Sequence, residues 1–194
     1  MVRRMSRPAF ALLLAAACGN PNNIVLGAVG ATTTTPLIVF DSINSAISGT
    51  ATLTDANGNP TGQSEVVIIS DKSGLCSALQ AHRDYFRNPP EAYEALVLFM
   101  PPGYLGTFVL GRGGDADQAT SSEIIAGGTS GALAQFSVVN GGYVALTTWS
   151  DSGGGHASGS FDLAYENPNV AGAFEFSGRF QTDVCTTLDG TLLP

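Results

Sequence analysis

The chain has 194 residues, of which 44% are hydrophobic and 12% are charged, and its formal net charge is −8. This composition is typical of a folded domain and excludes a chain that is disordered throughout. The excess of acidic groups repels phosphate, so it argues against nucleic acid and anionic lipid headgroups as partners.

The first 18 residues have the three-part layout of a secretory signal peptide. Arg3, Arg4 and Arg7 form a basic start, an unbroken apolar run covers residues 9–17, and Cys18 follows small residues. The apolar run is too short to span a bilayer as a helix. We therefore expect the chain to be exported, with residues 1–17 as the signal peptide.

The same stretch resembles the lipobox of bacterial lipoproteins. The run LAAAC at residues 14–18 places small residues directly before the cysteine. The resemblance implies cleavage before Cys18 and acylation of this residue, which would anchor the chain in a membrane. Gly19 stands where inner-membrane lipoproteins often carry Asp, so the family pattern points to the outer membrane, with the domain facing the periplasm or the cell surface.

Residues 18–35 carry no charge and are rich in Gly, Asn and Thr, so we expect a flexible tether there. Residues 36–194 should then form a single β-rich domain. Turn-forming residues separate short segments with strand patterns at residues 37–40, 48–54, 65–70, 95–100, 106–110, 133–139 and 143–149. The run Asn140-Gly141-Gly142 tolerates positive φ, so it is expected to join the last two strands as a hairpin turn.

The helical pattern is confined to about residues 73–88. Leu75, Leu79 and Phe86 recur at helical spacing, and Pro89 and Pro90 end the pattern. We expect this helix to cover one edge or one open end of the β structure.

The last hairpin, residues 157–185, alternates strictly between apolar and polar side chains. We expect one face of it to form half of the core, through Phe161, Leu163, Tyr165, Phe174, Phe176 and Phe180. The opposite face carries Asp162, Glu175 and Arg179 and should be a charged solvent face with one cross-strand ion pair. The whole pattern predicts a mainly β fold, an antiparallel β-sandwich or flattened β-barrel with one short α-helix.

Cys76 and Cys185 are expected to form a disulfide bond. An exported chain enters an oxidising compartment, and these residues belong to elements that otherwise have no covalent link. Alternation places Cys185 on the polar side of the last strand, beside Asp183. Either a bulge near Gly178 reverses the alternation, or the helix lies on that outer side; the second arrangement is favoured.

Residues 64–185 resemble a loose group of small bacterial lipoproteins of unassigned function. The shared motifs are SDKSGLCSALQ at residues 70–80 and the closing pattern GSFDL, GRF and C that ends at Cys185. The resemblance implies a disulfide-tied β domain and supplies no catalytic residues.

Other motifs point only weakly to chemistry. Residues 151–154, DSGG, are similar to the nucleophile loop of serine proteases, but His82 and His156 do not stand where that family has its histidine. Residues 55–59 are similar to the start of an EF-hand loop, yet Pro60 and Val66 occupy positions that need Gly and Glu. The first motif is interpreted as a flexible glycine loop and the second as a turn.

Two further possibilities concern ligands. Asp115 and Asp117 in a glycine loop are weak candidates for binding Ca²⁺. Tyr143, Trp149 and Tyr165 would form a sugar-binding platform if they were exposed, although aromatic residues are more often found in a core.

The sequence therefore favours a lipid-anchored cell-envelope lipoprotein with a non-enzymatic binding or structural role. The expected partners are the membrane, through acylated Cys18, and an envelope protein or glycan. No cofactor and no metal are expected. Two alternatives stay open: a small envelope hydrolase, and a carrier of an apolar ligand.

Overall fold

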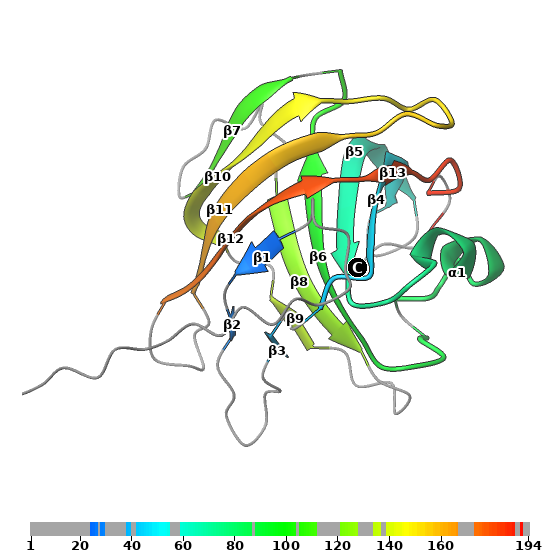
Figure 1. Cartoon of the computed structure of the whole chain (residues 1–194), viewed down its shortest axis with the longest axis horizontal. Coiled ribbons are helices and arrows are strands. Elements are labelled where there is room, and N and C mark those ends of the chain that lie inside the picture. The colour runs from blue at the N-terminus through cyan, green and yellow to red at the C-terminus, as the bar shows by residue number, and fades with distance from the viewer. Residues whose placement is uncertain are drawn as a thin grey trace, which may run out of the picture.

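The computed structural model describes residues 24–26, 28–29, 38–39, 42–54, 59–86, 88–103, 105–111, 121–127, 134–136, 139–166, 173–188 and 191. The described strands form two main sheets that face each other, with one short helix at the side of the molecule (Figure 1). The mainly β class is confirmed, and the architecture is a β-sandwich instead of a closed barrel in this part of the chain. No helix in the described ranges is both long and apolar enough to cross a membrane.

The first sheet has five strands, and every neighbouring pair in it is antiparallel. Its order is β1 (Ile24–Leu26), β12 (Ala173–Gln181), β11 (Ser158–Glu166), β10 (Val139–Thr148) and β7 (Gly106–Gly111). The long hairpin predicted from alternation is β11 and β12, and it lies at the centre of this sheet.

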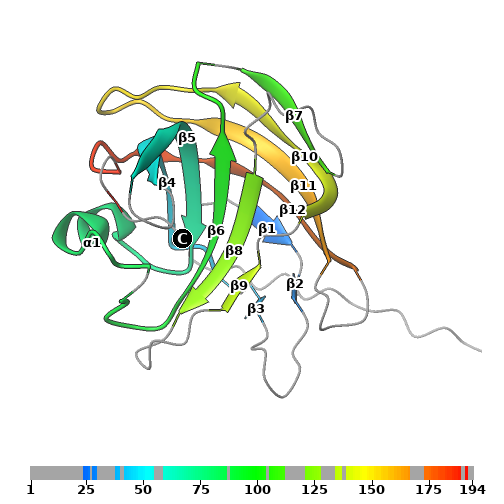
Figure 2. The ribbon, with the colours of Figure 1, turned by 180° about the vertical axis from the view of Figure 1, so that it is seen from behind.

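The second sheet has six strands and packs against the first (Figures 1 and 2). Its order is β13 (Asp183–Val184), β4 (Ser45–Thr54), β5 (Pro60–Ser70), β6 (Tyr93–Met100), β8 (Ser121–Gly127) and β9 (Ala134–Phe136). All its pairs are antiparallel except β13 with β4, which is parallel. A separate two-stranded sheet joins β2 (Ala28–Val29) to β3 (Ile38–Val39).

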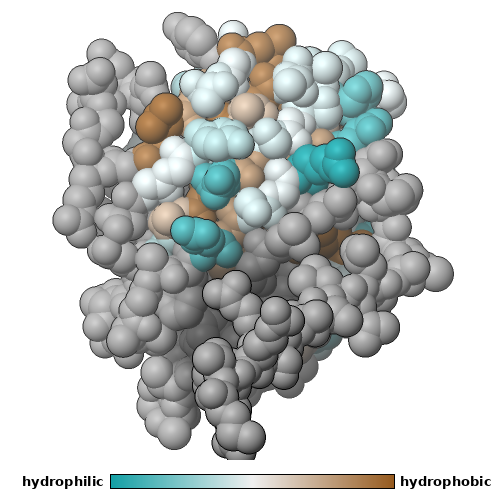
Figure 3. Space-filling model, turned by 60° about the vertical axis from the view of Figure 1, so that its left-hand side comes forward, coloured by the Kyte–Doolittle hydropathy of each residue, from teal (hydrophilic) through white to brown (hydrophobic). Residues whose placement is uncertain are grey.

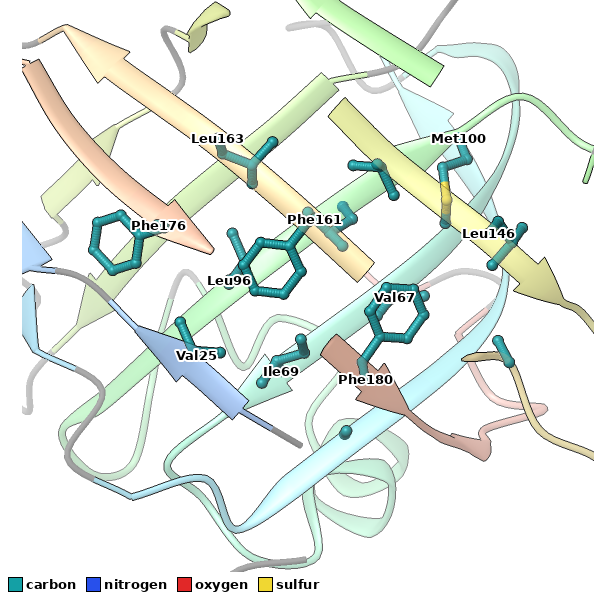
Figure 4. Packing of buried hydrophobic residues seen from close by; sticks show 14 of the residues in the cluster. Val25, Val67, Ile69, Leu96, Met100, Leu146, Phe161, Leu163, Phe176 and Phe180 are labelled. Atoms are coloured by element: carbon teal, nitrogen blue, oxygen red, sulfur yellow. The ribbon is translucent and has the colours of Figure 1, made fainter. Parts of the chain in front are cut away.

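The interior between the two sheets is filled by one cluster of apolar side chains (Figure 4). From the first sheet it takes Phe161, Leu163, Tyr165, Phe176 and Phe180, all at most 2% exposed. The prediction that one face of the last hairpin forms half of the core is therefore confirmed for these five residues. The Phe174 side chain lies outside the described residues.

A second apolar cluster lies on the other face of the six-stranded sheet, under the helix. The helix, α1 (Leu75–Ala81), is shorter than the expected 73–88, because the chain turns at His82 and continues as turns to Phe86. Leu75, Leu79, Tyr85 and Phe86 are buried there against side chains of β4, β5 and β6. Both faces of this sheet are thus covered, which explains why β5 and β6 are buried without a break over residues 64–70 and 95–100.

The chain changes sheets at Thr182, between β12 and β13. The buried Thr182 hydroxyl lies 2.7 Å from the Ser48 hydroxyl of β4 and accepts a hydrogen bond from the Ala157 backbone N–H at 3.0 Å. The Cys185 backbone N–H then donates to the Ser48 carbonyl at 2.7 Å. Because Cys185 belongs to the six-stranded sheet, the alternation of β12 does not decide which way it faces.

The disulfide bond between Cys76 and Cys185 is present, with an S–S distance of 2.09 Å. It joins α1 to the end of β13 across a sequence separation of 109 residues. The helix lies on an outer side, as favoured, but on that of the six-stranded sheet and not of the last hairpin. A register shift near Gly178 is not needed, because β11 and β12 pair continuously from Ser158 to Glu166.

The expected hairpin turn at residues 140–142 is wrong. These residues lie inside β10, which pairs with β11 and β7, whereas β9 pairs with β8 in the other sheet. Gly142 has φ 124°, and a Cβ there would collide with the Asp162 carbonyl oxygen of β11. At residue 142, glycine is therefore required by the close approach of two strands, next to a register shift between Val139 and Gly141, and not by a turn.

Three strands lie where none is predicted from the sequence: β1, β2 and β8. β8 has no counterpart among the predicted strands, and β1 and β2 fall within residues 18–35, the expected tether. Val25 of β1 is buried in the cluster between the sheets, and β1 pairs with β12 at the edge of the five-stranded sheet. Residues 24–26 are therefore part of the sandwich.

Candidate functional site

One face of the five-stranded sheet points away from the core, and no described element covers it. We call it the outer face. The strand register sets two rows of neighbours across it: Val109, Tyr143, Asp162 and Ser177 in one, and Thr107, Ala145, Ser160 and Arg179 in the next. Figure 3 turns this side of the molecule toward the viewer and shows hydrophilic residues scattered among weakly polar ones, with hydrophobic residues at the upper margin.

A shallow depression with a volume of about 530 Å³ lies on this face over β10, β11 and β12. Small residues of the middle strand, β11, line its floor, and the longer Arg179 and Gln181 of β12 line one side. Its lining residues are Thr147, Ser158, Gly159, Ser160, Arg179, Phe180 and Gln181. The lining thus contains hydroxyl groups, an amide and a guanidinium.

A bulge in β10 concentrates hydroxyl groups beside this depression. Leu146 pairs with Gly159 and Thr148 pairs with Ser158, so Thr147 is an extra residue in its strand. The Thr147 hydroxyl donates to the Ser158 carbonyl at 2.8 Å and lies 3.0 Å from the Ser158 hydroxyl, which is 2.7 Å from the Thr148 hydroxyl. The bulge leaves both threonine side chains exposed next to Ser158.

The charged groups of this face do not form the ion pair expected from the sequence. Asp162 and Arg179 lie on neighbouring strands and one row apart, yet they make no ion pair within the described residues. The two ion pairs recorded for those residues both involve Lys72, with Asp71 and Glu91. Asp162 and Arg179 are both exposed, so a ligand on the outer face can reach both groups.

The three aromatic residues considered for a platform separate. Tyr165 is buried in the core, and Trp149 is partly buried against the same cluster. Tyr143 is 39% exposed on the outer face, directly opposite Val109 of β7. One aromatic side chain, not three, is therefore available on this face.

The protease-like loop at residues 151–154 is a turn. The Gly155 backbone N–H donates to the Ser152 carbonyl at 2.9 Å, and the Ser152 hydroxyl lies 3.5 Å from an Asp151 carboxylate oxygen. His156 is exposed but makes no hydrogen bond with Ser152. The loop therefore lacks the pairing of serine with imidazole that a hydrolytic triad needs.

Sequence reasoning missed one unusual carboxyl group, that of Glu65. This residue is 4% exposed at the end of the sandwich interior, where one oxygen accepts a hydrogen bond from the Gly103 backbone N–H at 2.8 Å and the other has no partner. Burial raises the pKa of Glu65, and the charge of Asp151 acts in the same direction. Because Glu65 is enclosed, its carboxyl group is not open to a substrate in solution.

The remaining sequence candidates lie outside the described residues: Cys18, Asp115 and Asp117. Within the described ranges, no group of three or more His, Cys, Asp or Glu residues is placed to hold a metal ion. Comparisons of the chain with models of protein families, with curated proteins and with solved structures find no match.

Proposed function

We propose that this chain is an exported, lipid-anchored protein of the cell envelope that binds a glycan on the outer face of its five-stranded sheet. The lipid is carried by Cys18, and the most fitting location is the outer membrane. The domain binds its ligand and does not transform it. The observation that carries the proposal is the open depression of about 530 Å³ lined by hydroxyl, amide and guanidinium groups.

The chemistry of the outer face suits a polyhydroxylated ligand. Sugar hydroxyl groups both donate and accept hydrogen bonds, so they need partners of both kinds; Arg179 donates, Asp162 accepts, and Ser160 does either. Tyr143 offers a partly exposed ring one row away, against which the apolar face of a sugar ring can pack. A surface with these groups on fixed strands binds without large rearrangement.

The two alternative functions have less support. A carrier of an apolar ligand needs interior space, whereas the side chains of Phe161, Phe176 and Phe180 pack together between the sheets (Figure 4). A hydrolase needs a nucleophile and a base that converge on a substrate, whereas Ser152 and His156 are not joined by a hydrogen bond.

Binding is tested on the full chain with Cys18→Ser, which removes the proposed lipid site. The protein is screened on an array of neutral and acidic oligosaccharides, and hits are measured by calorimetry. Arg179→Ala should weaken binding about tenfold or more, because charge-assisted hydrogen bonds are lost. Arg83→Ala is the matched control, since Arg83 is an exposed arginine in the turns after α1. An array without hits, or equal losses in both variants, contradicts the proposal.

Anchoring is tested separately, by mass spectrometry of the wild-type chain and the Cys18→Ser variant from a producing bacterial cell. The wild type should begin at Cys18, carry acyl chains and sediment with membranes. The variant should lose both properties. A wild-type chain without acyl groups contradicts the lipoprotein part of the proposal and leaves the glycan measurement unaffected.

A further inference from the structure

The exposed large hydrophobic side chains of the described residues all gather at one edge of the five-stranded sheet. They are Leu105, 60% exposed, Val109, 66% exposed, and Tyr143, 39% exposed. Leu105 directly precedes β7, Val109 lies in β7, and Tyr143 is its cross-strand neighbour on β10. Because scattered apolar residues are normal on a surface, their concentration at a single sheet edge is the informative feature.

β7 is also an edge strand with an open side. Among the described strands it pairs with β10 alone, so no described strand pairs with the backbone N–H and C=O groups along its other side. Its sequence, GTFVLG, has no charge, no proline and no register shift against β10. Those are the devices by which proteins usually block an edge strand, and β7 has none of them.

The other sheet edges differ from β7. β13 and β9 have two and three residues, and β13 carries the exposed Asp183. β1, with three residues, forms the opposite edge of the five-stranded sheet. With six residues, β7 is the longest edge strand in the described part of the chain.

The apolar pattern of β7 conflicts with the exposure of one of its side chains. In β5 and β6, unbroken apolar runs occur where both faces of the sheet are buried. β7 has a similar run, Phe108-Val109-Leu110, in which Phe108 and Leu110 are buried but Val109 is exposed. Val109 occupies a position where a strand with one wet face would carry a polar residue.

We infer that two copies of this chain associate through β7, with the β7 strands antiparallel and the two five-stranded sheets joined into one. A second β7 supplies everything this edge requires: an extended strand of equal length, β-branched side chains at Thr107 and Val109, and no charge. The last point matters because the full chain carries a net charge of −8, so contact between copies is favoured where neither presents acidic groups. The twofold arrangement also brings the Val109 side chains of both copies into the contact.

The self-association is measured on the full chain with Cys18→Ser, by sedimentation velocity over a range of concentrations near physiological salt. The Cys18→Ser chain without further substitutions should shift from monomer to dimer as its concentration rises. Val109→Lys places a positive charge from each copy in the contact and should weaken dimerisation about tenfold. Ser152→Lys adds the same charge on an exposed turn and should leave dimerisation unchanged.

Hydrogen exchange identifies the surface involved. Backbone amides of β7 should become protected as concentration rises, and this protection should disappear in Val109→Lys. If that variant does not fold, Leu105→Lys, which lies just before the strand, replaces it. A chain that stays monomeric at all concentrations, or a dimer that both lysine variants at β7 leave intact, overturns the inference.

Discussion

Removing the disulfide bond should cost this protein a large part of its stability. The bond closes a loop of 109 residues. The chain-entropy model gives roughly 5 kcal/mol for a loop of that length, comparable with the whole stability of a small domain. The bond also fixes β13, which has two residues and pairs with β4 in parallel. The backbone hydrogen bond from Cys185 to Ser48 remains without the disulfide, but no covalent link then joins this segment to α1.

The perturbation is the pair Cys76→Ala and Cys185→Ala, on the Cys18→Ser background. Alanine is preferable to serine because Cys185 is 1% exposed, and a serine there would bury a hydroxyl group. Urea unfolding followed by circular dichroism gives the free energy of unfolding, and wild-type protein treated with a reductant should show the same loss. A loss below about 1 kcal/mol would refute the reasoning that this bond ties α1 and β13 to the sandwich.

Three other substitutions test the core and the strand contacts. Phe161→Ala should lower the free energy of unfolding by about 3–5 kcal/mol in urea titrations, since its ring is fully buried between the sheets. Gly142→Ala should introduce strain of about 1–3 kcal/mol into the folded state and so lower the melting temperature. Gly141→Ala should leave the melting temperature unchanged, because a Cβ at residue 141 meets nothing within 4 Å. Because burial raises the pKa of Glu65, the unfolded chain releases this proton at lower pH than the folded chain, so the fold loses stability as pH rises from the ordinary value of 4.5 to the raised one. Glu65→Gln should therefore gain stability relative to wild type as the pH rises above the ordinary value of 4.5, and parallel curves of stability against pH for the two proteins would contradict this.

Much of the sandwich was predictable because local patterns and tertiary structure agree in its long strands. The alternation in β11 and β12 identified Phe161 and Phe176 as core residues, and both are buried. The disulfide followed from the expected compartment and from the elements that carry the cysteines. In these places, neighbouring residues along the chain contain the information needed.

The errors arise where distant segments decide the local structure. The glycines at residues 141 and 142 are typical of a turn, and only the approach of Asp162 on β11 shows why the strand needs glycine at residue 142. The sheet change at Thr182 depends on its hydrogen bond to Ser48, 134 residues earlier in the sequence. Distant segments also decide the outer face. The neighbours of Arg179 follow from the register of three strands, which cannot be read from the sequence of any one of them.

The contrast between the two sheets nevertheless shows where to look for a binding surface. β5 and β6 have unbroken apolar runs and are covered on both faces, by the sandwich core and by α1 with the turns that follow it. β10, β11 and β12 alternate, and their polar residues form the face that the described elements leave open. β7 belongs to the alternating sheet but carries an apolar run, so its pattern conflicts with its exposure. If a second chain covers β7, the conflict disappears, and the polar strands beside it are left free for a ligand.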